Sequence, residues 1–368
     1  MEAKKEVKYQ YKSIRKQVDN KTSWKGIWLI VSVIFVISCI VTWIIFYSMS
    51  SYSPYKEFDN FVRRYKKKYE SKQKYMEKMK IYKDNLEKIN EFNAGEHSYK
   101  LEANEFADLT DEEFYELKYL KPFKPFDVKP EEVPPFKVLK AVDWSNASVR
   151  DEGDCESYWV SATISMLETY YALAHSNTLN TMEPSEVWEQ LKRKRLSYQE
   201  LLDCATTDKV GYTCNAGDPC TAFDYIKQHG ISSLRDYPSY VNNRQCFNNI
   251  TKRVLQFKHG CKTIQPNLSL PLAYKLQSHP VIVYITSSSF GFRFYKSGII
   301  TERCEGSLGH YALLVGEGVS DKGLLYWKVK NTWGPNWGDK GYVKILRVNN
   351  ENPSPSVCDI TASACYPA

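Results

Sequence analysis

The sequence lacks the basic stripe that nucleic-acid-binding proteins carry. Its 368 residues have a formal net charge of +7, but residues 1–25 alone hold eight Lys and Arg against three Asp and Glu. Beyond residue 25 the charges are mixed, and no extended basic stripe carries interleaved aromatic side chains. We therefore expect no nucleic-acid partner. Neither a cofactor nor a metal ion is expected.

Charge is also absent from residues 26–47, which read GIWLIVSVIFVISCIVTWIIFY. A helix of this length rises about 30 Å, enough to cross the core of a bilayer. A cleaved signal peptide would have a shorter apolar region and small residues at a cleavage site. Because the basic flank precedes the segment, we expect residues 1–25 to be a cytoplasmic tail and residues 26–47 a signal-anchor. The chain would then be a single-pass type II membrane protein, facing the lumen or the exterior from about Ser48 onward.

Cysteine is nearly absent from the first 150 residues, where only Cys39 of the ten occurs. The other nine lie on the expected lumenal side, where an oxidising compartment favours disulfide bonds. The sequons at Asn146, Asn249 and Asn267 are candidate glycan sites on that side, whereas the sequon at Asn20 should stay bare. We expect a secretory or endolysosomal compartment.

Two segments after the anchor place apolar residues at helical spacing. One face holds Phe58, Phe61, Val62 and Tyr65, and the other holds Tyr82, Leu86, Ile89 and Phe92. Taken alone, this pattern fits a solvated amphipathic hairpin. Thr110 followed by Glu113 predicts a capping box at the start of a further helix. Residues 121–137, KPFKPFDVKPEEVPPFK, are rich in Pro and Lys and lack helical or strand periodicity, which indicates a linker.

Residues 151–162, DEGDCESYWVSA, resemble the active-site segment of the papain-like cysteine peptidases, roughly N-Q-G-x-C-G-S-C-W-A-F-S. Four residues fall on that pattern: Gly153, Cys155, Ser157 and Trp159. The position of the catalytic cysteine holds Tyr158. The position of the oxyanion-hole glutamine holds Glu152, and a neighbouring glycine is replaced by Glu156.

Three later segments extend the resemblance. Residues 196–204, LSYQELLDC, resemble L-S-E-Q-E-L-V-D-C, and residues 214–217, CNAG, resemble C-N-G-G, which implies a substrate cleft at Ala216 and Gly217. Residues 308–318, LGHYALLVGEG, place His310 at the catalytic histidine. Residues 326–345, YWKVKNTWGPNWGDKGYVKI, place Asn331 where the family orients that histidine and Trp333 where a tryptophan covers the pair. Trp333, Glu156, Ser157 and Trp159 are therefore expected beside the cleft as well.

The region before the linker resembles the family's propeptide. Its helix pattern, E-x3-R-x3-F-x2-N-x3-I-x3-N, falls on Lys74, Lys78, Tyr82, Asn85, Ile89 and Asn93. Residues 101–114, LEANEFADLTDEEF, resemble the G-x-N-x-F-x-D segment. The resemblance implies an inhibitory propeptide domain at residues 55–120 that lies across the cleft antiparallel to substrate. A zymogen would be cut within the linker, residues 121–138.

The resemblance implies an α+β fold of two lobes for residues 139–368, one helical and one like a β-barrel. The long central helix should run over residues 158–174, and residues 281–285, VIVYI, should form a strand. Position in the family pairs Cys155 with Cys214, Cys204 with Cys246, and Cys304 with Cys358. A bond between Cys220 and Cys261 is a further hypothesis, which leaves Cys365.

The altered positions argue against the family's chemistry. Tyr158 is a poor replacement for a thiol, because a phenol has a pKa near 10 and its oxygen lies further from the backbone. Glu152 would repel an oxyanion where glutamine donates a hydrogen bond, and loss of one such donor costs on the order of 10²–10³ in rate. Glu156 adds negative charge. Ser157 is the family's ordinary residue and should point away from His310, so we do not expect it to rescue the reaction.

The sequence therefore favours a membrane-anchored pseudoprotease that binds a peptide or protein ligand, and its own propeptide, in the cleft. Two alternatives stay open: an active endopeptidase with unusual chemistry, and a lumenal structural or adhesion protein. The signal-anchor, the fold and a composition rich in Lys, Asn and Tyr together resemble the cysteine peptidases of apicomplexan parasites such as Theileria, Babesia and Plasmodium.

Overall fold

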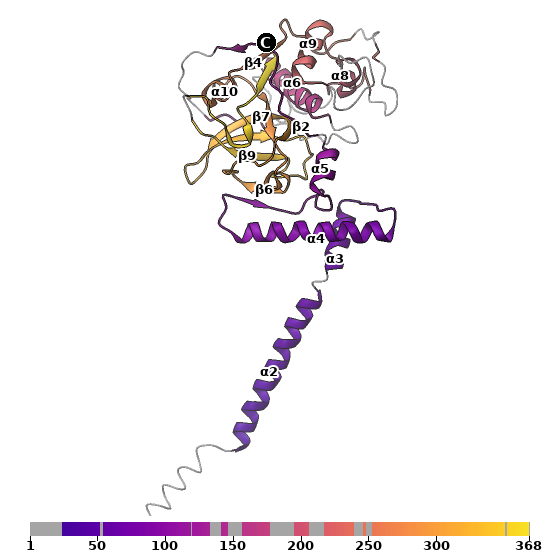
Figure 1. The fold of residues 1–368 in the computed structure, drawn as a ribbon, viewed down its shortest axis with the longest axis vertical. Helices are drawn as coiled ribbons and strands as arrows, with labels where there is room; N and C mark the ends of the chain where they lie inside the picture. Colours follow the sequence, from indigo (N-terminus) through magenta and orange to yellow (C-terminus); the bar gives the residue numbers. More distant parts are fainter. Residues whose placement is uncertain are drawn as a thin grey trace, which may run out of the picture. The chain divides into compact units, whose positions relative to one another are not determined.

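A computed structural model describes most of the chain. The described residues are 24–51, 54–118, 120–132, 141–145, 157–176, 195–205, 217–238, 246–247, 252–349 and 352–367. The chain divides into two compact units, Met1–Glu70 and Ser71–Ala368 (Figure 1). The second unit holds the sheet and most of the core.

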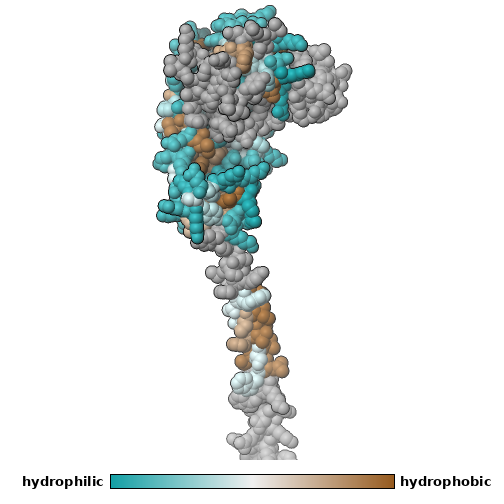
Figure 2. All heavy atoms as spheres, turned by 90° about the vertical axis from the view of Figure 1, so that its right-hand side faces the viewer, coloured by the Kyte–Doolittle hydropathy of each residue, from teal (hydrophilic) through white to brown (hydrophobic). Residues whose placement is uncertain are grey.

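The first unit contains helices α2 (Trp24–Ser51) and α3 (Pro54–Arg64). The side chains of α2 that the structure describes, residues 28–44, are all exposed and largely hydrophobic (Figure 2). Among residues with described placement, no helix combines the length and the apolarity needed to span a membrane. The span expected at residues 26–47 is therefore not confirmed. In α3, Phe58 and Phe61 are buried, as the helical spacing predicts.

The second unit opens with helix α4 (Lys72–Ala94), strand β1 (Tyr99–Leu101) and helix α5 (Asp111–Leu117). The expected capping box is present, because Thr110 and Glu113 bond reciprocally. Helix α4 buries two polar side chains with partners outside the helix. Lys78 Nζ lies 2.5 Å from the Glu113 carboxylate, and Asn85 donates to the carbonyl of Ala107 at 2.9 Å. These contacts fix α4 against the segment that leads into α5.

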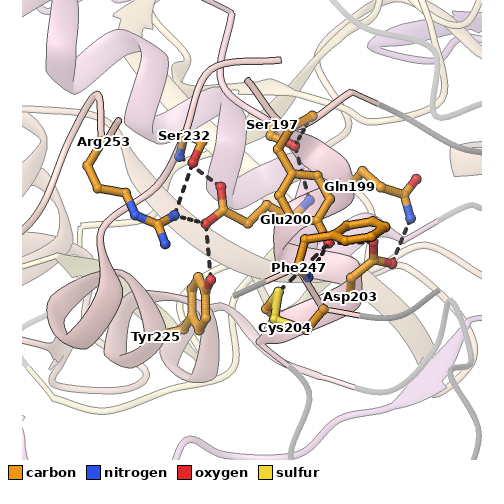
Figure 3. The surroundings of a disulfide bond; sticks show 11 residues. Ser197, Gln199, Glu200, Asp203, Cys204, Tyr225, Ser232, Phe247 and Arg253 are labelled. Atoms are coloured by element: carbon orange, nitrogen blue, oxygen red, sulfur yellow. Dashed lines mark hydrogen bonds and ion pairs between the residues drawn. A yellow bond between two sulfur atoms is a disulfide. The ribbon is translucent and has the colours of Figure 1, made fainter. Parts of the chain in front are cut away.

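Among the described residues, the helical lobe contains α6 (Tyr158–Ser176), α8 (Tyr198–Cys204) and α9 (Pro219–His229). Helix α6 begins at the residue predicted and ends two residues later than predicted. A buried carboxylate joins α8 to its neighbours (Figure 3). Glu200 accepts from the backbone N–H of Ser232 at 2.8 Å and from the Tyr225 hydroxyl at 3.0 Å, and it pairs with Arg253. Burial of this charge is tolerated because each oxygen has a partner.

The main sheet is mixed and has the strand order β3-β4-β10-β5-β7-β8-β9, with β2 paired to β7. Its strands are β2 (Lys121–Pro122), β3 (Pro130–Glu131), β4 (Cys261–Ile264), β5 (Val281–Thr286), β7 (Leu308–Val319), β8 (Leu325–Lys330), β9 (Tyr342–Leu346) and β10 (Ala364–Pro367). Strand β6 (Tyr295–Gly298) pairs with β1. Short helices α10 (Ser269–Leu276), α11 (Phe290–Arg293) and η1 (Val357–Asp359) connect them. The predicted strand at residues 281–285 is β5, which is buried along its length.

The region expected to be an unstructured linker contributes two strands to this sheet. β2 runs antiparallel to β7 with Lys121 opposite Gly309, and β3 runs parallel to β4 with Pro130 opposite Thr263. The sequence prediction missed them because each strand is two residues long and is ordered by its partner strand rather than by a periodic pattern of its own.

Three disulfide bonds lie among the described residues. They join Cys204 with Cys246, Cys220 with Cys261, and Cys304 with Cys358. Two are pairings that the family resemblance implies, and the Cys220–Cys261 bond is the one proposed as a further hypothesis. Cys155 and Cys214 lie outside the described residues, so their expected bond stays a prediction. Cys365 is a free, buried thiol.

Candidate active site

The site forms where the first turn of α6 packs against β7. Tyr158 is the first residue of α6, and its ring centroid lies 6.1 Å from that of His310 and 6.0 Å from that of Tyr311. Only 5% of Tyr158 is exposed. A side chain at this position sits at the N-terminus of a helix, where the helix dipole would stabilise an anion. The phenol instead fills this position with a packed ring.

His310 is fully buried and is held at both ring nitrogens. Nε2 lies 2.6 Å from Asn331 Oδ1, and Nδ1 lies 2.8 Å from Ser287 Oγ. The Trp333 indole stacks on the imidazole at 4.9 Å. Burial lowers the pKa of His310 from 6.5 to about 4; the bond to Asn331 opposes this shift, and the charge of Lys118 adds to it. The imidazole is therefore neutral at neutral and mildly acidic pH.

The other predicted cleft residues that the structure describes are largely internal. Ser157 and Trp159 are both fully buried, and Ser157 Oγ has no hydrogen-bond partner among the described residues. Gly217 has a φ of +143°, and a Cβ added there would lie 2.7 Å from the Trp159 ring. Trp159 therefore packs beneath Gly217 as core, rather than lining an open cleft.

Residues 104–118 and 120–126 form a segment that covers this site. Phe106 and Phe114 pack edge-on against Trp333 with ring centroids 5.8 and 5.3 Å away. The Tyr115 hydroxyl donates to the carbonyl of Ser288 at 3.0 Å, and β2 pairs with β7 beside His310. An extended segment added to a sheet next to the histidine occupies the place that a bound peptide would use.

Arg293, at the end of α11, anchors the same segment. It is 1% exposed, and its guanidinium donates to the carbonyls of Leu109 at 2.7 Å and Thr110 at 3.3 Å and contacts the Asp111 carboxylate at 3.0 Å. Burial lowers the pKa of Arg293 to about 10, an effect that Asp111 opposes. A further bond runs from Asn104 Nδ2 to the carbonyl of Arg293 at 2.7 Å.

The chain matches known family models over most of its length. The profile described as papain family cysteine protease matches residues 138–368. The chain belongs to the papain family. The profile of the cathepsin propeptide inhibitor domain matches residues 58–114. The papain-like fold and the propeptide domain are thereby confirmed, and residues 104–114 of the segment that covers His310 belong to the matched propeptide domain.

Relatives align over nearly the whole chain. Cysteine protease XCP2 of Arabidopsis thaliana is 32% identical over 87% of this chain and 90% of its own length. Papaya proteinase 4 of Carica papaya is 31% identical over 84% of this chain and 86% of its own. Among solved structures, the proform of the ragweed cysteine protease Amb a 11 has a TM-score of 0.69 at 26% identity, covering 85% of this chain and 94% of that one. Digestive procathepsin L 3 of Tenebrio molitor gives 0.69 at 27% identity, with coverages of 86% and 99%. These relatives do not test the apicomplexan type, the membrane anchor or the loss of activity.

Part of the predicted site lies outside the described residues. These are Glu152 and Glu156 beside the nucleophile position, Ala216 in the expected cleft, and Cys155 and Cys214. The structure does bring Tyr158, His310, Asn331 and Trp333 together in one site. Their assignment to family roles rests on the sequence motifs.

Three sulfur atoms form the cluster of possible metal ligands among the described residues. The Sγ atoms of Cys220, Cys261 and Cys365 lie within 4.8 Å of one another. Two of them form the Cys220–Cys261 bond, which leaves Cys365 as the thiol of the cluster. Burial raises the pKa of the Cys365 thiol well above its usual value. A disulfide and a neutral thiol do not supply the thiolates that a metal requires.

Two groups that act on His310 were not predicted from the sequence. Lys118 follows α5 and lowers the pKa of His310 from the propeptide side, and Ser287 follows β5. One signal for Ser287 was available: it lies two residues after the strand predicted at residues 281–285. The pairing of that strand, which places Ile285 opposite His310, could not be read from the sequence.

Proposed function

We propose that this papain-family protein binds extended peptide segments in its cleft and does not cleave them by thiol chemistry. The observation that carries the proposal is Tyr158. Its buried ring packs against His310 at the start of α6, where the motif places the family's cysteine. A phenol is far less acidic than an activated thiol and cannot form the thiolate–imidazolium pair.

Peptide binding is supported by the way residues 121–126, which follow the propeptide domain, are held. β2 adds to the edge of β7 through backbone hydrogen bonds, and Phe123 and Phe126 pack on Tyr284 and Tyr311. Backbone pairing gives affinity that depends little on sequence, and side-chain contacts add selectivity. A peptide of extended conformation with aromatic residues would satisfy the same surface once the propeptide has left.

An active peptidase is the second candidate. The bond between His310 Nε2 and Asn331 Oδ1, at 2.6 Å, has the arrangement that orients a catalytic base. The relatives reported above are described as proteases. Since these groups supply base and orienter but no thiol at position 158, this candidate requires a different nucleophile.

We also propose that the protein is anchored in a membrane by residues 26–47, with the papain-like domain on the lumenal or exterior side. The uncharged segment, its basic N-terminal flank and the exposed apolar side chains of α2 support this proposal. The type II apicomplexan form is part of the same proposal. Extraction of cell membranes with alkaline carbonate tests it: an anchored protein stays in the pellet, and release into the supernatant would contradict the anchor.

Peptidase activity is the test of the functional proposal. The full chain in detergent, with its propeptide cleaved in the linker, would be assayed with fluorogenic peptides at acidic and neutral pH. We expect no cleavage by the natural sequence and cleavage by the Tyr158→Cys, Glu152→Gln double variant. The matched control adds His310→Ala to that double variant and should be silent. Cleavage by the natural sequence that disappears in its own His310→Ala variant would overturn the proposal.

Binding is tested separately. A fluorescent peptide that reproduces residues 121–127 should bind the processed protein saturably. A scrambled peptide of the same composition is the control. Equal binding of both peptides would remove the support for a specific cleft.

A further inference from the structure

A serine hydroxyl hydrogen-bonds to Nδ1 of His310, the ring nitrogen that does not contact Asn331. Ser287 Oγ lies 2.8 Å from His310 Nδ1, and both residues are fully buried. Ser287 is the first residue after β5, and its backbone N–H donates to the carbonyl of Leu308 at 3.1 Å. Because Leu308 and His310 lie on the same strand, this bond sets the position of the hydroxyl relative to the imidazole.

The hydrogen-bond pattern fixes which atoms carry protons. The backbone N–H of Thr332 lies 2.9 Å from one side-chain atom of Asn331, and an N–H can only donate, so that atom is Oδ1. The same oxygen lies 2.6 Å from His310 Nε2, which must therefore donate its proton to it. In a neutral imidazole the other nitrogen, Nδ1, then carries a lone pair. Ser287 Oγ–H is the donor that meets this lone pair.

We propose that Ser287 is a positioning residue that holds His310 as the neutral imidazole protonated at Nε2 and blocks its only free proton acceptor. The inference rests on the proposed function and deepens it. Because Nε2 donates its proton to Asn331, any nucleophile would have to give its proton to Nδ1. Nδ1 already accepts a hydrogen bond from the Ser287 hydroxyl. The loss of thiol chemistry would thus involve the base as well as the nucleophile position.

Burial, the charge of Lys118 and the Ser287 hydroxyl oppose protonation of His310, and the bond to Asn331 favours it. Ionised imidazole would donate from both nitrogens, so the Ser287 hydroxyl would have to turn and accept. Lys118 brings a positive charge from the propeptide side, and the rings of Tyr158, Phe292 and Trp333 pack around the imidazole without a carboxylate among them. The new charge would therefore have no anion to pair with among the described neighbours.

The first test is nitrogen-15 NMR of the histidines in the full chain in detergent micelles, with His310 assigned by loss of its signal in His310→Gln. We expect the shifts of a neutral ring protonated at Nε2, with no titration between pH 5 and pH 8. In Ser287→Ala the Nδ1 shift should change, and the pKa of His310 should rise by about half to one pH unit, because the lost bond favours the neutral form. Ser287→Thr keeps the hydroxyl and should behave like the natural sequence.

The second test uses thiol reactivity in the Tyr158→Cys, Glu152→Gln background. Adding Ser287→Ala should free Nδ1 and raise the rate at which the thiol introduced at position 158 is alkylated at pH 6 by about 3- to 10-fold, on the order of one lost hydrogen bond. Adding Ser287→Thr should leave the rate unchanged. If the double variant is alkylated at the same rate with Ala as with Ser at position 287, the proposal is overturned.

The two proposals fail in different ways. A tautomer protonated at Nδ1, or a charged His310 at pH 6 in the natural sequence, would overturn the role of Ser287 even if Ser287→Ala did not fold. Labelling of Ser287 by a fluorophosphonate probe would show that the hydroxyl is a nucleophile, which also overturns a positioning role. Cleavage of peptides by the natural sequence would instead contradict the proposed function, whatever the NMR shows.

Discussion

The buried imidazole of His310 should make the stability of the protein depend on pH in a defined window. Its pKa in the folded protein is about 4, against 6.5 when unperturbed. Between these values the unfolded chain binds a proton that the folded chain refuses, so stability falls as the pH falls. The gap of about 2.5 pH units corresponds to about 3 kcal/mol of unfolding free energy, present in full above pH 6.5 and lost by about pH 4.

The assay is urea unfolding of the natural protein and of His310→Gln, followed by tryptophan fluorescence at half-unit steps from pH 4 to pH 8. The difference between the two free energies should be constant above pH 6.5 and should shrink by about 3 kcal/mol by pH 4. The other five histidines are common to both proteins and cancel in the difference, including His279, whose pKa burial also lowers. A difference that stays flat over the whole range would show that His310 is either exposed or charged in the folded protein, and would refute the reasoning.

Three further predictions concern the packing around the site. Lys78→Met should leave the Glu113 carboxylate without its 2.5 Å partner and lower the local stability of α5 by about 1–3 kcal/mol. Hydrogen exchange measures this change: the amides of α5 should exchange faster, and those of β8 should be unchanged. Gly217→Ala should cost about 2–4 kcal/mol, because its Cβ would meet the Trp159 ring at a strained φ; an unchanged melting temperature would contradict this. Peptide mapping should recover the three disulfide bonds with Cys365 unalkylated in the native state, since that thiol is buried and its pKa is raised.

The parts of the fold that the sequence predicted well are those with local signals. The capping box at Thr110 needed only two residues at the right spacing, and the strand at residues 281–285 was an uninterrupted apolar run. Helix α4 was predicted from apolar spacing. A solvated amphipathic hairpin would expose its polar side chains, whereas α4 buries Lys78 and Asn85. Their partners, Glu113 and the carbonyl of Ala107, lie 35 and 22 residues away, beyond the reach of any local pattern.

The parts that could not be predicted depend on pairing between distant segments. β3 is ordered by β4, and Glu131 at its end pairs with Lys275 at 2.7 Å, 144 positions along the chain (275 − 131). The same is true of the site. Tyr158, His310 and Asn331 were predicted from motifs. Ser287 belongs to no motif, and its contact with His310 depends on the pairing of β5 with β7.

The presence of a well-formed His310–Asn331 pair is not in itself an argument for catalysis. Trp333, which stacks on His310, also receives the edges of Phe106 and Phe114 from the propeptide. Asn331 Oδ1 accepts from the backbone N–H of Thr332 as well as from the imidazole, so it ties the end of β8 to β7. Removing either side chain would leave a buried polar group unpaired or open a cavity beneath the propeptide. These residues therefore stabilise the fold and the propeptide contact whether or not a nucleophile is present, and activity has to be decided at Tyr158 and at the free nitrogen of His310.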